Sequence, residues 1–317
     1  MRLQRKLLGY IIFIVVLALF PFFLNERFFI YLLTLSLMWG MVASNWDLLM
    51  GYCGIFSLAQ MSFFIIGGYT SAMLVKYLGI DPFIGLLCAG VVTAGASTLI
   101  VGLPTLRLKG IYVALLTVAF NEILRIFILS FGPAGITGGI AGLVSIPPYS
   151  FGGRPFTLIN NYYLILLLFS ISLLATYSIL DSRISLAFAA LRESEPYAVS
   201  RGVNAYSTKV IVFLISCFFT GVAGAFYVHN FGTISVLQLG DISVLFTLFA
   251  MIIIGGWGRF PGAIIGSFIV TFLSEYVLHY IATYRLITLG LIEIVIIVLM
   301  PAGAIKILDV FRSRKTA

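Results

Sequence analysis

Residues 181–209, DSRISLAFAALRESEPYAVSRGVNAYSTK, form a polar stretch between two long apolar runs. The stretch contains the signals of a short helix with both ends marked. Ser194 or Glu195 can cap the start of this helix, and Pro196 suits the first turn, where a missing N–H costs nothing. Gly202 supplies the left-handed residue that ends a helix. Because a helix of at most two turns is not stable alone in water, we expect it to pack on another surface, although an ordinary solvated loop remains an alternative.

The composition is that of a membrane protein. The chain has 317 residues, of which 61% are hydrophobic and 9% charged, and its mean hydropathy is +1.14. Soluble domains carry about 25% charged residues, so the sequence predicts an integral membrane protein. The net charge of +8 does not indicate a nucleic-acid partner, because its meaning depends on the side of the membrane on which each basic residue lies. Single cysteines at Cys53, Cys88 and Cys217 lack the paired spacing of a metal or redox site.

The alternation of apolar runs and polar breaks predicts one all-α membrane domain covering residues 1–317. We expect about ten spans, at residues 7–24, 28–49, 55–75, 83–103, 110–131, 161–180, 210–231, 242–256, 263–281 and 286–300. Glycine and polar residues interrupt the third and eighth spans, so either could be broken or re-entrant. The glycine-rich breaks at 51–71 and 255–267 fall in corresponding places of the two halves, which favours an inverted repeat around a translocation path.

The basic residues predict the orientation. With the N-terminus inside, most of the 19 Lys and Arg residues fall in cytoplasmic segments. The exceptions are Arg27, Lys76, Arg154 and Arg285, which fall outside, and Arg125, which falls within the fifth span. This asymmetry indicates that both termini are cytoplasmic. It places residues 181–209 in the cytoplasm and the Gly/Pro-rich segment 132–160 outside.

Ionisable groups within spans are costly and are therefore functional candidates. Glu122 and Arg125 are three residues apart, so they share a helix face and can neutralise each other. Glu275 and His279 also share a face, but two ligands do not make a zinc site. Glu293 must pair across helices or stay protonated. The polar positions that could line a translocation path are Gln60, Asn121, Glu122 and Arg125.

Several kinds of chemistry are absent from the sequence. It contains no GxxxxGK[ST] nucleotide-binding loop, no GxSxG or HExxH motif and no catalytic triad, so we expect no cofactor and no enzyme activity. A transport subunit is the simplest class. The residues alone leave open a secondary transporter or channel that uses Glu122, Glu275 or Glu293 for ion coupling.

Five blocks in fixed order carry a family resemblance, which extends over residues 36–301. The chain resembles the LivM-type permease subunit of branched-chain amino acid ABC importers in GYCGIFSLAQMSFFIIGGYTSA (51–72), LRLKGIYVALLTVAFNEILR (106–125), TGGIAGLVSIP (137–147), ALRESEPYAVSRGVNAYSTKVIVFLISCFFTGVAGAFY (190–227) and IIGGWGRFPGAIIGS (253–267). Relatives have small residues after the loop glutamate, whereas this chain has Pro196, Tyr197 and Ser200 there.

The resemblance implies the partners of the chain. They are a second similar permease, two cytoplasmic ABC ATPases and an external substrate-binding protein, in the cytoplasmic membrane of a bacterium or archaeon. It implies transport of branched-chain amino acids, although related permeases carry urea or short amides. It also implies that residues 191–204 couple to the ATPases, with candidate contacts at Leu191, Arg192, Glu193, Ser194, Glu195, Pro196, Tyr197, Arg201 and Gly202.

Overall fold

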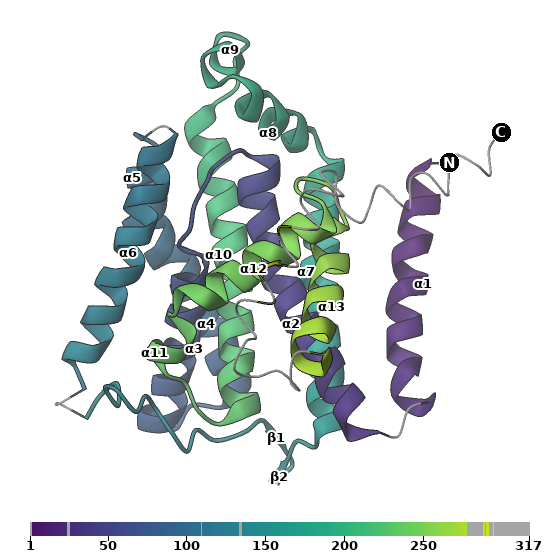
Figure 1. Ribbon diagram of the computed structural model, residues 1–317, viewed down its shortest axis with the longest axis vertical. Helices are drawn as coiled ribbons and strands as arrows, with labels where there is room; N and C mark the ends of the chain where they lie inside the picture. The colour runs from purple at the N-terminus through teal and green to yellow at the C-terminus, as the bar shows by residue number, and fades with distance from the viewer. Residues whose placement is uncertain are drawn as a thin grey trace.

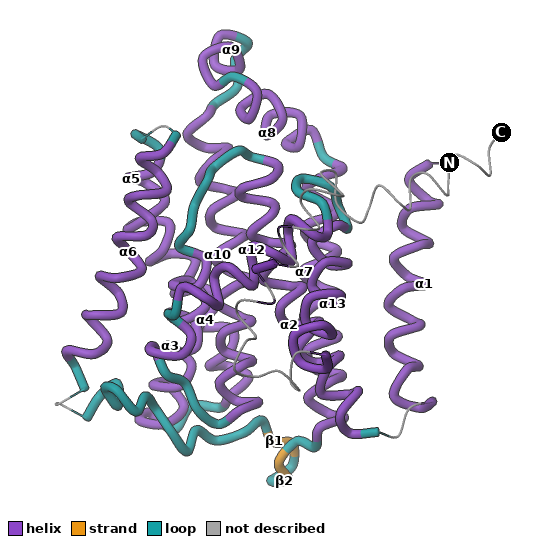
Figure 2. Tube along the Cα trace, viewed as in Figure 1, coloured by secondary structure: helices purple, strands orange, loops and turns teal. Residues whose placement is uncertain are grey.

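A computed structural model describes residues 2–23, 26–108, 110–132 and 135–277, together with residues 288, 290, 291 and 294. Within these ranges the regular secondary structure is helical apart from one short hairpin, and loops connect the helices, as Figure 2 shows. The α-helices are α1 (Arg2–Phe23), α2 (Arg27–Asp47), α3 (Gln60–Leu78), α4 (Pro82–Ser97), α5 (Leu103–Thr105), α6 (Ile111–Ser130), α7 (Leu158–Asp181), α8 (Arg183–Glu193), α9 (Glu195–Ser200), α10 (Ala205–Phe231), α11 (Val236–Leu239), α12 (Ile242–Gly255) and α13 (Gly262–Phe272). π-Helical turns extend three of them, at η1 (Leu48–Tyr52), η2 (Thr98–Gly102) and η3 (Leu273–Val277). The hairpin is β1 (Ser150–Phe151) and β2 (Arg154–Pro155).

Six helical segments are long and apolar enough to cross a membrane: Arg27–Tyr52, Gln60–Leu78, Pro82–Thr105, Ile111–Ser130, Leu158–Asp181 and Ala205–Phe231. A hydrocarbon core of about 30 Å requires about 20 helical residues. With 14 residues, α12 reaches only about 21 Å, so the eighth expected span is too short to cross as a single helix. The all-α membrane class is therefore confirmed. The expected span 286–300, together with His279 and Glu293, lies largely outside the described residues.

The helices pack in two groups, and glycines allow close contacts within each group. In the first group, α10 packs on α3 and α4, and in the second, α2 packs on α7 and α13 while α12 packs on α13. A Cβ atom on Gly67 of α3 would collide with the backbone of Gly221 on α10, and one on Gly266 of α13 with the carbonyl of Met251 on α12. These close approaches are possible because small residues let helix backbones touch.

The Gly/Pro-rich segment is tied to the end of α10 rather than forming a free loop. Leu143 and Ile234 exchange backbone hydrogen bonds of 2.9 Å in each direction. His229 is buried, with its Nδ1 2.7 Å from the carbonyl oxygen of Pro147 and its Nε2 2.8 Å from the hydroxyl of Ser71. His229 therefore lies in the interior, because this segment folds over it.

The polar stretch 181–209 contains two short helices, α8 and α9, where one was predicted. Figure 1 shows α8 and α9 at the end of the bundle where α1 begins, opposite the β1–β2 hairpin. Ser182 caps α8 by accepting a hydrogen bond from the Ile184 N–H, and extended backbone at Ser194 (φ −160°, ψ 106°) separates α8 from α9. Pro196 lies in the first turn of α9, and Gly202 follows its end with φ +88°, as predicted. The additional helix α8 was not predicted, because its residues are mixed in polarity.

Candidate coupling and translocation site

The chain between η1 and α3 is irregular, and polar side chains satisfy its backbone. In the segment 53–59, the Leu58 N–H donates to Thr117 Oγ1 at 3.0 Å. The Leu58 carbonyl accepts from Asn121 Nδ2 at 2.8 Å, and Ser62 Oγ donates to Asn121 Oδ1. Non-helical backbone inside a membrane bundle requires such partners, because no lipid group can replace them. The predicted path residue Asn121 therefore holds the broken part of the third expected span.

Gln60 lies in the packed interior between α3 and α10. Its side chain is fully buried, and its Nε2 donates to Thr220 Oγ1 at 2.5 Å and to Ser216 Oγ at 3.4 Å. Ser216 in turn donates to the backbone carbonyl of Asn45 on α2 at 2.8 Å. Gln60 thus belongs to a network that joins the two helix groups.

The remaining predicted path residues meet at one small pocket. Arg125 Nη1 lies 3.5 Å from Glu122 Oε2, which confirms that the two charges share a face of α6. With Ser62, Asn121 and Asp241, they line a pocket of about 50 Å³ between α3, α6 and the start of α12. The Arg125 and Glu122 side chains stay 39% and 57% exposed, so both charges are available to a partner or a substrate.

Asp241 is a pocket residue that the sequence reasoning missed. It caps α12 by accepting a hydrogen bond of 2.8 Å from the Ser243 N–H. Hydrogen bonds from the Ser243 side chain and backbone, and then the nearby Arg125, lower the pKa of Asp241, so this carboxylate is charged at neutral pH. An aspartate immediately before an apolar run is a recognisable helix-start signal, and it could have located this residue.

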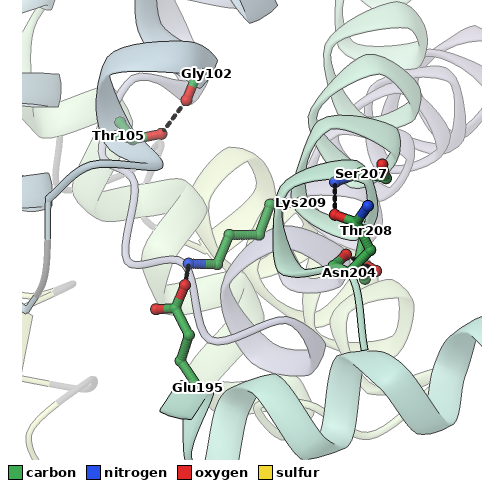
Figure 3. A network of polar contacts seen from close by, with 7 residues as sticks. All are labelled: Gly102, Thr105, Glu195, Asn204, Ser207, Thr208 and Lys209. Carbon is green, nitrogen blue, oxygen red and sulfur yellow. Dashed lines mark hydrogen bonds and ion pairs between the residues drawn. The ribbon is translucent and has the colours of Figure 1, made fainter. Parts of the chain in front are cut away.

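A cavity of about 710 Å³ opens at the α8–α9 end. Its walls come from the irregular segment, the turn between α5 and α6, and the helices α8 to α10: Cys53, Gly54, Ile55, Phe56, Thr105, Leu106, Leu108, Gly110, Ile111, Val113, Ala114, Leu191, Glu195, Pro196 and Lys209. Figure 3 shows Lys209 extending from α10 to Glu195 on α9, with Nζ and Oε1 2.7 Å apart. The Lys209 side chain is only 11% exposed. This ion pair therefore anchors α9 beside the cavity.

The nine predicted coupling residues divide into two sets. Leu191 is buried, Glu195 is partly buried and pairs with Lys209, and Arg192 is exposed but donates to the Gly51 carbonyl, so these three contact the bundle. The other set is exposed and comprises Glu193, Ser194, Pro196, Tyr197, Arg201 and Gly202. Within it, Arg201 Nη2 donates to the Tyr197 hydroxyl at 2.9 Å, and the guanidinium lies 5.2 Å from the ring centroid. This exposed surface is available to a partner protein.

Comparison with known proteins identifies the family. Residues 28–300 match the family described as the branched-chain amino acid transport system / permease component. The chain belongs to this family. It is 28% identical to the high-affinity branched-chain amino acid transport system permease protein LivM of Escherichia coli (strain K12), over 93% of this chain and 74% of that protein. It is also 28% identical to LivM of Salmonella typhimurium, over 92% of this chain and 72% of that protein.

A related permease from an archaeon is similar to most of the chain. This is the probable branched-chain amino acid transport permease protein LivH of Methanocaldococcus jannaschii, which is 26% identical over 71% of this chain and 72% of that protein. No solved structure matches. As a permease component, the chain is a membrane transport protein, and its six apolar helices are consistent with a position in the membrane.

Proposed function

We propose that this chain is a permease subunit of an ABC importer and that, with a second similar permease, it forms the path for branched-chain amino acids. The observation that carries the proposal is the exposed helical segment α8–α9 at one end of a membrane bundle whose sequence lacks a nucleotide-binding loop. An ABC importer subunit without its own ATP site requires ATPase partners, and an exposed helix between spans gives them a surface to bind. Urea and short amides are the alternative substrates, and a secondary transporter is the alternative class.

The proposed topology places both termini and α8–α9 in the cytoplasm. The excess of basic residues at that end supports it, as does the start of α1 beside the α8 end in Figure 1. About ten segments then enter the membrane, of which α12 is too short to cross as a single helix, and the glycine-rich breaks at 51–71 and 255–267 relate the two halves as an inverted repeat. The segment 135–157 lies outside, where its hairpin faces the external substrate-binding protein.

The proposed path follows one face of α6. Its first turns line the α8-end cavity, Thr117 and Asn121 hold Leu58, and Glu122 and Arg125 line the small pocket. Only 17% of the most apolar stretch of α6 is buried, against 67% for α10. Charges that face lipid are costly, so we place the second permease over this face. Arg125 and the two carboxylates match the opposite charges of an amino-acid zwitterion.

The proposed mechanism is alternating access driven by the ATPases. The ATPases bind α8–α9 through the exposed Glu193, Tyr197 and Arg201. When the two ATPases close on ATP, the helix groups rotate as rigid bodies. An external binding protein delivers the substrate, and the ATPases hydrolyse ATP. The permease contributes the path and needs no cofactor.

Mass spectrometry of the complex purified from native membranes in mild detergent tests the proposal. We expect two ATPases that carry nucleotide-binding loops and a second permease to co-purify with the chain. A homo-oligomer without an ATPase contradicts the importer. In that case, we measure substrate uptake by the chain alone. If an uncoupler abolishes this uptake, the chain is a secondary transporter, and Glu122 and Glu275 are the candidates for ion coupling.

A further inference from the structure

The coupling segment is tied to the bundle at two points, one on each side of the break at Ser194. We infer that Arg192 and Lys209 are positioning residues that connect α8 and α9 to different helix groups, so that bending at Ser194 shifts one group against the other. The inference rests on the proposed function, because it assigns the route by which motion of the ATPases reaches the membrane helices.

The first tie runs from α8 to the end of α2. Arg192 Nη1 donates to the Gly51 carbonyl at 2.5 Å. Gly54 lies directly beneath the same residue, since a Cβ atom there would be 3.1 Å from Arg192 Cα and 3.2 Å from its Cβ. The end of α8 therefore lies directly against the backbone of Gly54.

The same junction includes the second glycine-rich break. Asp47 at the end of α2 is 3% exposed, and its Oδ1 accepts a hydrogen bond of 2.8 Å from the Gly258 N–H. The Tyr52 hydroxyl accepts from the Phe260 N–H at 2.5 Å. The segment 256–261 connects α12 to α13, so the Arg192 contact reaches these two helices through η1, while the buried Phe188 of α8 packs in a cluster with Val212 and Phe213 of α10.

The second tie runs from α9 to the other group. Glu195 Oε1 accepts from Lys209 Nζ at 2.7 Å, and Lys209 lies on α10, which packs on α3 and α4 (Figure 3). The partly buried environment strengthens this pair relative to one on an exposed surface.

The residue between the two ties is the point that can bend. Ser194 is extended, so α8 and α9 are separate helices, and the ties at Arg192 and Glu195 lie on opposite sides of it. The helix groups meet where α10 packs on α2, and the bond from Ser216 to the Asn45 carbonyl crosses that interface. A change in the angle between α8 and α9 therefore acts on this interface.

The test uses the complex purified with its ATPases and partner permease and reconstituted in liposomes. We measure ATPase co-purification, ATP hydrolysis and uptake of radiolabelled leucine supplied with the external binding protein. For Arg192→Gln and for Lys209→Met, we expect normal co-purification and hydrolysis within about twofold of wild type. We expect the number of leucine molecules imported per ATP hydrolysed to fall about tenfold, because each variant loses one charge-assisted hydrogen bond. Arg183→Gln, on the exposed first turn of α8, is the matched control and leaves all three unchanged.

A charge exchange separates lost coupling from misfolding. Lys209→Glu reduces import per ATP, and adding Glu195→Lys restores it, because the ion pair forms again with its charges reversed. Normal import per ATP in Arg192→Gln or Lys209→Met overturns the inference. Loss of the ATPases from the Arg192→Gln complex also overturns it, since Arg192 is then an ATPase contact. A wild-type preparation without ATPases overturns the proposed function itself.

Discussion

Replacement of Gly51 by alanine tests the contact between the two glycine-rich breaks. A Cβ atom at Gly51 would lie 2.7 Å from the Gly258 nitrogen and 2.8 Å from its Cα, and it would also collide with the Asp47 carboxylate. Two of these obstacles are backbone atoms of a segment that hydrogen bonds hold in place. The methyl group can therefore be accommodated only by separating the two breaks.

Overpacking of this kind costs about 1–3 kcal/mol. Gly95→Ala is the control, because Gly95 lies within α4 with nothing within 4 Å of the new methyl group. Alanine is favoured over glycine in a helix by about 1 kcal/mol, so the control is neutral or slightly stabilising. The difference between the two variants isolates the steric cost.

The assay is unfolding of the purified chain in mixed micelles, with the transition midpoint and slope measured for both variants. We expect Gly51→Ala to unfold at a lower denaturing-detergent fraction than wild type, and Gly95→Ala at the same or a higher fraction. Equal midpoints for the two variants would refute the close approach of residues 51 and 258, and the junction beneath α8 with it.

Three further predictions concern the docking surface, the irregular segment and a buried thiol. Glu193→Lys reduces ATPase co-purification without changing the amount of protein in the membrane, whereas equal co-purification contradicts docking at α8–α9; Asp181→Lys, at the exposed end of α7, is the control. Asn121→Leu leaves the Leu58 carbonyl without its donor and lowers the free energy of unfolding by about 1–3 kcal/mol, as measured in mixed micelles, and an unchanged value would show that Asn121 does not hold this segment. Cys53 is only 2% exposed, so its thiol is poorly accessible to a labelling reagent. In a variant without the other two cysteines, we therefore expect no mass increase after maleimide treatment in mild detergent, and rapid labelling contradicts the buried position.

Local patterns predicted several features correctly. Glu122 and Arg125 share a face because residues three apart on a helix are neighbours whatever surrounds them. Pro196 and Gly202 mark the ends of α9 because their backbone preferences are intrinsic. The exposed or buried state of a coupling residue does not follow from such rules, and Arg192 and Glu195 proved to be bound to the bundle.

The sequence by itself determined that this is an all-α membrane protein, where its major helices lie and which polar segment interrupts them, because hydropathy and helix-end signals are local properties. Only the tertiary structure decided that Asp47 meets Gly258, 211 residues away, and that Glu195 is paired with Lys209. It also brought Asp241 beside Arg125. Contacts between distant segments depend on how whole helices pack against each other, and the hydropathy of one segment carries no record of the partner it will touch.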